Sequence, residues 1–401
     1  MKTKHIILRS TRAPHPPIVA RGIRPNAELR AEVDLDLAAN ADIRLEIDEL
    51  DLHDAARLQR SNDIVVMAPA MPMQLVTPRD VRDATPEETG DIAWGVQAVR
   101  ADTSPATGAG VVVAVLDTGI APNHPAFAGV ELVRRNFTAE SDDDLHGHGT
   151  HCAGTIFGRR VSGTRIGVAP GVTKALIGKV LGAGGGSSEL IADAMHWAVK
   201  QGAHIISMSL GMDFPGYARK LRESGLAEEQ AVSLALEGYR ANVVLFERLV
   251  AFLHVQPHPV LVVAAAGNES RREDNGNAIE IGVAPPAASA GIVSVAALGR
   301  RQDGTLGVAS FSNTGATISG PGKDIVSAGL NNGLRSMSGT SMATPHIAGV
   351  AALWAERLRK QGNLNLTNLT GKLVGQAVFQ HLQPGIDPAD VGAGLVIAPQ
   401  E

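Results

Sequence analysis

Four polar residues lie in local contexts that suit acyl transfer by a serine. That chemistry needs a nucleophile, a base, a group that orients the base, and donors for the oxyanion. The candidates are Ser341 in GTSMATPHIAG, His148 in HGHGTHCAG, Asp117 in LDTG and Asn268 in AAAGNES. Each residue type fits one of the four roles, and each also has an ordinary structural explanation.

Ser341 opens a segment whose apolar residues recur at helical spacing. A serine at the start of a buried helix, entered through Gly339, would aim its hydroxyl into a cleft. The helix N-terminus would then set backbone N–H groups near a developing oxyanion. The alternative is a plain helix cap, which Pro345 just inside the helix fits equally well.

The other three candidates are also open to a second interpretation. Glycines beside His148 permit close backbone approach, whereas a metal site with His146 and His151 is not expected, because the spacing matches neither HExxH nor a zinc finger. Asp117 would orient the histidine, or form a turn with the Thr-Gly that follows it. Asn268 would donate its amide to the oxyanion, or act as a turn residue.

The elements that must position these residues alternate between strands and helices. Apolar runs predict buried strands, and helical spacing predicts a helix capped by Ser188 and another after Ser341. The predicted strands cover 111–116, 176–180, 205–210, 260–266 and 292–298. The alternation predicts an α/β fold of three layers, a parallel sheet with helices on both faces. Active sites of such sheets collect at the carboxyl ends of strands, where Asp117 and Asn268 stand.

Residues 1–84 differ in pattern from the rest of the chain. Alternating apolar residues within 28–51, a helix-like DLHDAARLQRS and a strand-like IVVMAPAMPMQLV predict a small α+β module. A polar linker at 85–93 separates this module from a larger domain at 94–401. Within that domain, apolar residues in 213–258 recur at steps of three and four, which predicts an amphipathic helix.

Composition excludes several classes of protein. The 401 residues are 44% hydrophobic with a net charge of −5, and no Lys/Arg run indicates a nucleic-acid partner. No stretch approaches the roughly 20 apolar residues of a membrane-spanning helix. Cys152 is the only cysteine, and the apolar run at 6–8 is too short for a signal-peptide core. We therefore expect a cytoplasmic location and no membrane partner, with secretion by another route as the alternative.

The four motifs together resemble the subtilase family of serine peptidases (peptidase family S8), over about residues 94–399. The order Asp, His, Asn, Ser fits subtilisin. The resemblance implies a serine endopeptidase acting on proteins or peptides, with Ser341 as nucleophile, His148 as general base and then acid, and Asp117 as its orienter. Asn268 and the Ser341 N–H would stabilise the oxyanion. HGTHCAG is similar to the proteinase K branch, which implies that Cys152 is a packing thiol.

The family binds peptides as an added strand beside two backbone segments, and residues before the catalytic asparagine form the wall of the first pocket. The matching residues here are Gly185, Gly186 and Ser187, then Ser209, Leu210 and Gly211, and for the pocket Ala265, Ala266 and Gly267. Small pocket walls favour a large uncharged side chain before the scissile bond, whereas Glu269 at the rim would favour a basic one. The preference stays open.

Three departures from the family matter. The loop that binds calcium in many subtilases reads FGRRVSGTRIGVAP, with arginines in place of oxygen ligands, so we expect no cofactor and regard structural calcium as doubtful. Asp142, Asp143 and Asp144 are expected to form a solvated acidic loop. The 213–258 insertion would cap the cleft, receive a partner, or form an extra surface helix.

The N-terminal module stands where the family carries an inhibitory propeptide. The resemblance implies an intramolecular inhibitor that is cut within 73–91; the alternative is a permanently attached accessory domain.

Rival functions fit less well. An inactive subtilase serving as a binding module would lack a catalytic residue, and none is missing. An esterase of the α/β-hydrolase type would show GxSxG in the order Ser, Asp, His. A sedolisin would carry carboxylates in place of His148 and Asn268.

Overall fold

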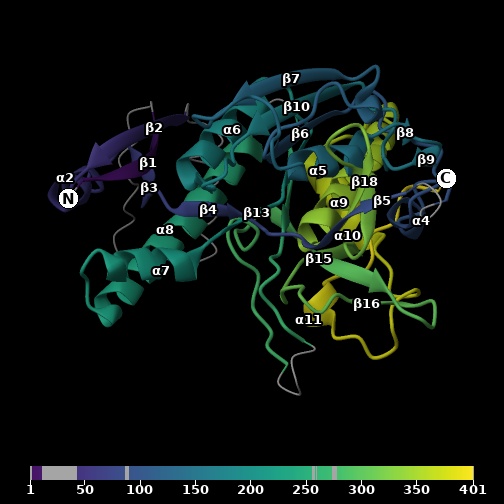
Figure 1. Ribbon diagram of the computed structural model, residues 1–401. Helices are drawn as coiled ribbons and strands as arrows, with labels where there is room; N and C mark the ends of the chain where they lie inside the picture. Colours follow the sequence, from purple (N-terminus) through teal and green to yellow (C-terminus); the bar gives the residue numbers. More distant parts are fainter. Residues whose placement is uncertain are drawn as a thin grey trace, which may run out of the picture.

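A twisted, mostly parallel sheet forms the centre of the molecule (Figure 1). The computed structural model describes residues 2–10, 43–85, 90–254, 258, 260–272 and 278–400. The strand order is β16-β15-β14-β12-β6-β10-β7, with β17 also paired to β15, and β16 alone runs antiparallel to its neighbour. The strands are β6 (Val112–Asp117), β7 (Glu131–Asn136), β10 (Lys174–Lys179), β12 (Ile205–Met208), β14 (Leu261–Ala265), β15 (Ile292–Arg300), β16 (Leu306–Val308) and β17 (Ile318–Pro321). The predicted three-layer α/β fold is confirmed.

Strand β6 shows why this part of the sequence is a continuous apolar run. Val113 and Val115 pack into one buried cluster, whereas Ala114 and Leu116 pack into a second cluster on the opposite face. Because successive side chains of a strand point to opposite faces, both sets are apolar only when both faces are covered. The strand therefore ends at Asp117 on a fully enclosed sheet.

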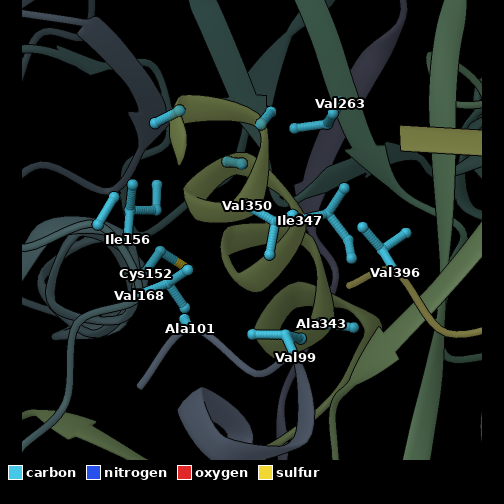
Figure 2. Packing of buried hydrophobic residues seen from close by; sticks show 14 of the residues in the cluster. Val99, Ala101, Cys152, Ile156, Val168, Val263, Ala343, Ile347, Val350 and Val396 are labelled. Atoms are coloured by element: carbon cyan, nitrogen blue, oxygen red, sulfur yellow. The ribbon is translucent and has the colours of Figure 1, made fainter. Parts of the chain in front are cut away.

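Different helices cover the two faces. Helices α5 (His148–Phe157) and α9 (Thr340–Lys360) contribute to the first cluster, and α6 (Ser188–Lys200) and α8 (Glu228–His254) contribute to the second. Figure 2 shows Cys152 and Ile156 of α5 in one buried cluster with Ile347 and Val350 of α9. Small residues on both helices permit this close packing, which holds His148 and Ser341 on adjoining elements.

The N-terminal module is a three-stranded antiparallel sheet with one helix. Its strand order is β2-β1-β3, formed by β1 (Thr3–Ser10), β2 (Ile43–Leu50) and β3 (Ile64–Pro69), with α2 (Leu52–Leu58) after β2. This confirms the predicted helix and the strand over the second half of the alternating segment. The predicted strand positions before residue 43 lie outside the described residues.

One prediction about the end of this module was wrong. IVVMAPAMPMQLV is two strands in different sheets, because the chain leaves β3 and continues as β4 (Pro72–Leu75). The polar residues after it form β5 (Arg79–Ala84), which pairs with β19 (Leu334–Ser338). Exposed polar side chains concealed this edge strand, since it is held by backbone pairing and buries little.

The 213–258 insertion is a helical hairpin rather than one helix. Helix α7 (Phe214–Glu223) is followed by α8, which packs against both α6 and β3. The Asn242 amide donates to the Pro69 carbonyl at 2.8 Å. The insertion therefore supports the N-terminal module and also covers the central sheet.

The predicted cap of α6 is wrong: Ser188 does not cap this helix, and its Oγ instead accepts the Met71 N–H at 2.9 Å.

Short elements complete the fold. They are α4 (Trp94–Ala98), η1 (Pro125–Phe127), β8 (Arg160–Val161), β9 (Thr164–Arg165), β11 (Gly186–Ser187), β13 (Leu210–Met212), β18 (Ile325–Ala328), α10 (Leu366–Gly375) and α11 (Pro388–Val391). Within the described residues, no helix is both long and apolar enough to cross a membrane.

Helix α9 is anchored at its far end by a buried carboxylate. Glu356 Oε2 accepts the N–H groups of Thr107, Gly108 and Ala109 at 2.7, 2.7 and 3.0 Å. Glu356→Ala would leave three backbone donors without an acceptor, and we expect it to lower the free energy of unfolding by about 3 kcal/mol or more. Urea unfolding in a Ser341→Ala background measures this without self-digestion.

The matched control is Lys360→Ala, which removes only the exposed partner of Glu356. It should cost less than about 1 kcal/mol. Equal, small losses in both variants would contradict the anchoring role of Glu356.

Candidate active site

Asp117 and His148 form a buried pair at the carboxyl edge of the sheet. Asp117 ends β6 and His148 begins α5, and His148 Nδ1 lies 2.8 Å from Asp117 Oδ1. Both side chains are at most 1% exposed. A carboxylate bonded to Nδ1 leaves the Nε2 lone pair free to accept a proton, which is the tautomer that a general base needs.

The pKa of His148 is raised well above its ordinary value. Burial alone would lower this pKa, but the Asp117 carboxylate favours the charged imidazolium through its charge and its hydrogen bond, and these effects prevail. The pair is therefore suited to hold a proton taken from a nucleophile.

Asp144 ties the two residues together, and sequence reasoning missed it. Its Oδ1 accepts from the Thr118 hydroxyl and from the N–H groups of His146 and Gly147, and its Oδ2 accepts from the Thr150 N–H and hydroxyl. The expected solvated acidic loop is wrong for this residue, because Asp144 is buried. One carboxylate thus fixes the residue after Asp117 relative to both flanks of His148.

The glycine after His148 is required by close backbone approach. A Cβ at Gly149 would lie 2.2 Å from the Gly119 carbonyl oxygen. The Gly149 N–H also donates to the Thr118 hydroxyl at 2.9 Å. A side chain here would push α5 away from the end of β6 and separate the pair.

Ser341 lies in the first turn of α9, and its hydroxyl is already bonded. Its Oγ donates to the carbonyl of Val76, in the N-terminal segment, at 2.8 Å. His148 Nε2 is buried and has no hydrogen-bond partner among the described residues. The Ser341 hydroxyl and the His148 imidazole are therefore not bonded to each other in the intact chain.

Asn268 presents its amide nitrogen to the same segment. Its Nδ2 donates to the Thr77 carbonyl at 3.0 Å, while its Oδ1 accepts from the Thr340 N–H and hydroxyl, both at 2.9 Å. Thr340 therefore fixes which end of the amide faces the cleft. Sequence reasoning missed this role, although the place of Thr340 directly before Ser341 was an available signal.

The predicted substrate-binding segments flank β4, which lies in the cleft as the middle strand of a three-stranded sheet (Figure 1). Gly186 and Ser187 pair antiparallel with Met73 and Pro72 on one side. Leu210 and Gly211 pair with Leu75 and Gln74 on the other side, the Ser209 carbonyl accepts from Val76 N–H at 3.4 Å, and a Cβ at Gly185 would meet the Met73 carbonyl. All six predicted residues border this strand.

A cavity of about 750 Å³ opens beside Val76. Ala265 and Gly267 line it as predicted, and Gly267 has φ +115°, a conformation that favours glycine. Ala266 does not line it; its side chain packs behind the wall against Ala296 and Ala316. Successive side chains at the end of a strand point to opposite sides, so Ala266 points away from the cavity.

The buried side chains around Asp117 and His148 are poorly suited to bind a metal ion. In the part of the chain that the structure describes, the group with suitably close ligand atoms is Asp117, His148 and Cys152. Burial raises the pKa of the Cys152 thiol, and its Sγ packs 3.5 Å from the Ser341 carbonyl, as the predicted packing thiol would. His151 lies beside the carbonyls of Ile325 and Arg335, which leaves its Nε2 occupied as a donor.

Comparisons with known proteins agree with this geometry. Residues 108–393 match the Subtilase family. The chain is 35% identical to the M-protease of Shouchella clausii (strain KSM-K16) over 286 residues, which are 69% of this chain and 63% of that relative. It is 31% identical to the intracellular serine protease of Paenibacillus polymyxa over 318 residues, 77% of this chain and 86% of the relative. It is also 35% identical to Subtilisin Savinase of Lederbergia lenta over 286 residues, 69% of this chain and 89% of the relative.

The chain belongs to the subtilase family. Its matched domain is a serine endopeptidase domain, and the resemblance predicted from the four motifs is confirmed. The match covers less than two thirds of the M-protease. The family match begins at residue 108 and does not include the N-terminal module.

The Asp117–His148 bond makes a prediction about pH. In the role that the subtilase resemblance implies for His148, its neutral imidazole is the base, so peptide hydrolysis should be lost as the pH falls through the raised pKa of His148. Asp117→Asn removes the negative charge that raises this pKa, so the loss should move to lower pH, and kcat should fall by about 10⁴-fold. A pH profile of kcat/KM measures both effects.

The matched control is Asp142→Asn, which removes an exposed carboxylate of the neighbouring loop and should leave the profile unchanged. A profile in Asp117→Asn that keeps the wild-type midpoint would show that this pair does not set the pKa of the base.

Proposed function

We propose that this chain is a self-inhibited serine endopeptidase whose N-terminal module is its intramolecular inhibitor. The observation that carries the proposal is the bond from Ser341 Oγ to the Val76 carbonyl. A segment of the protein's own chain lies where a peptide substrate would lie, and it engages the nucleophile.

In the active form, each residue has one role. Ser341 Oγ attacks the carbonyl carbon of the substrate while His148 Nε2 takes its proton, and the same proton later passes to the leaving amine. Asp117 holds the imidazole and stabilises the imidazolium. The Asn268 amide and the Ser341 N–H stabilise the oxyanion, and the loss of one such donor in subtilisin lowers kcat by about 10²–10³-fold.

The N-terminal segment is held in a way that does not lead to attack. The carbonyl facing Ser341 is that of Val76, yet the Asn268 amide binds the next carbonyl, that of Thr77. For attack, both groups must act on one carbonyl, the hydroxyl on its carbon and the amide on its oxygen. In addition, the Ser341 proton points to a carbonyl oxygen instead of to His148. Pro78 restricts Thr77 to extended conformations, which favours this arrangement.

Contacts on both sides of the cleft keep the segment in place. Strand β5 pairs with β19 beyond the catalytic serine, and Arg79 donates to the Asn268 carbonyl at 3.0 Å. On the other side, the module is tied to α6 and α8 through Met71 with Ser188 and Pro69 with Asn242. The active site therefore opens only when this whole segment leaves or is cut.

Fluorophosphonate labelling followed by intact mass tests the proposal. The freshly purified full chain should label slowly, because Ser341 is engaged. Labelling should speed up as the chain loses its N-terminal residues by a cut within 73–91. Ser341→Ala should neither label nor lose these residues, and Ser224→Ala, at the exposed end of α7, should behave as the wild type.

Other outcomes would overturn the proposal in different ways. Fast labelling of the intact chain would make the module a permanent accessory domain. A folded wild type that is never labelled, even after its N-terminal residues are removed, would indicate an inactive subtilase that serves as a binding module.

We also propose proteins or peptides in the cytoplasm as the substrates. The relative from Paenibacillus polymyxa is named an intracellular serine protease, and the chain has a single buried cysteine. Backbone pairing supplies most of the contacts to the strand in the cleft, which favours extended segments with little demand on sequence.

Calcium does not fit the loop that follows the histidine helix. The carbonyls there are already taken by guanidinium donors: Arg159 donates to the Val172 carbonyl at 3.0 Å, and Arg165 donates to those of Gly167 and Ala101 at 3.2 and 3.0 Å. Near the acidic loop, the buried Lys179 ammonium donates to the Ser141 and Asp143 carbonyls. Fixed cations thus occupy the places where oxygen ligands would be needed.

Chelation should therefore leave thermal stability unchanged. We expect the melting temperature of the Ser341→Ala chain to be the same, within about 1 °C, in EDTA and in millimolar calcium. Calcium at a hundred times the dissociation constant of a site would add about 2.7 kcal/mol to the free energy of unfolding. An increase of several degrees in the melting temperature in calcium would therefore contradict the assignment.

A further inference from the structure

One side chain of the insertion reaches the strand in the cleft. Asp213 Oδ2 accepts from Gln74 Nε2 at 2.7 Å. Gln74 stands opposite Gly211 in the β4–β13 ladder, so the side-chain contact is added to the backbone pairing. Such a contact depends on which side chain the bound strand carries at this position, whereas the backbone pairing does not.

The position of Gln74 relative to the nucleophile defines a subsite. Ser341 meets the Val76 carbonyl, so Val76 occupies the position immediately before the scissile bond. Counting back along the strand, Gln74 is the third residue on the acyl side (P3). A substrate strand in the same register would place its P3 side chain beside Asp213.

Asp213 is held ready by the helix that it caps. Its Oδ1 accepts the Gly216 N–H at 2.9 Å at the start of α7, and this bond leaves Oδ2 facing the cleft. Because the cap is internal to the insertion, the carboxylate stays in place when the N-terminal segment leaves.

The charges around the cavity favour a cation. Among the described residues that line it, the charged side chains are Arg79, Asp213 and Glu269. Arg79 belongs to the N-terminal segment and leaves with it. Glu269 belongs to the wall, where its Oε2 accepts from Asn313 Nδ2 at 2.6 Å. An emptied cleft therefore presents two carboxylates and no basic side chain from this set.

We propose that Asp213 forms an acidic P3 subsite that selects peptides with lysine or arginine two residues before the one that is cleaved at its carbonyl. The inference rests on the proposed function, because it takes residues 72–76 as the stand-in for a substrate. In the intact chain, Gln74 occupies the subsite with a neutral amide donor, whereas a preferred substrate would place a positively charged side chain there.

A matched peptide series tests the selection. Acyl-Met-X-Leu-Val p-nitroanilides, with X as Lys, Gln, Met or Glu, copy residues 73–76 around a varied P3. We expect kcat/KM to be about threefold to fivefold higher for Lys than for Met, and lowest for Glu, as for a partly exposed ion pair. Asp213→Asn keeps an acceptor for the α7 cap and should abolish the Lys preference, and high salt should reduce it in the wild type.

No preference at P3, or a preference that survives Asp213→Asn, would overturn the proposal.

A second measurement on the full chain separates this proposal from the proposed function. Gln74→Lys should slow fluorophosphonate labelling of the intact chain and Gln74→Glu should speed it, and Asp213→Asn should remove the difference. If the segment does not inhibit, neither variant changes labelling, yet the peptide series still reports the subsite. If only the subsite is wrong, labelling of the intact chain stays slow while the series shows no P3 preference.

Discussion

The hydrogen bond between Ser341 Oγ and the Val76 carbonyl connects the N-terminal segment to the catalytic domain. It joins the first turn of α9 to the strand that leaves the N-terminal module, inside a cleft whose walls belong to the catalytic domain. A serine hydroxyl has one proton to donate. While that proton is directed at Val76, it is not directed at His148, so the proposed latency would have the same physical cause as the occupation of the cleft.

The buried pair of Asp117 and His148 depends on the sheet beneath it. Parallel strands carry their last residues to one edge, and β6 and β14 bring Asp117 and the chain leading to Asn268 to that edge. The exact positions of Asp117, His148 and Asn268 then depend on side chains other than the four candidate residues. Asp144 joins both ends of the pair through five hydrogen bonds, and Thr340 orients the Asn268 amide.

The sequence predicted the fold class and singled out the four candidate residues, because each lies in a run that is apolar or glycine-rich for reasons of packing. It was less informative where backbone pairing carries the structure. Strand β5 has mostly exposed polar side chains, so its sequence lacks the alternation of apolar and polar residues that predicts a strand. Asp144 looked like one of three solvated acids, because a sequence does not show which carboxylate faces buried N–H groups. Ser188 fitted a helix cap, but its hydroxyl serves the incoming chain at Met71.

Hydrogen exchange of the intact Ser341→Ala chain tests whether residues 72–84 occupy the cleft, because this variant cannot cut itself and keeps the ladder around β4. The amides of residues 72–84, and of their partners at 210–212 and 334–338, should exchange far more slowly than those of an unstructured chain. Fast exchange across 72–84 in a folded protein would show that the segment does not occupy the cleft, and would contradict the account.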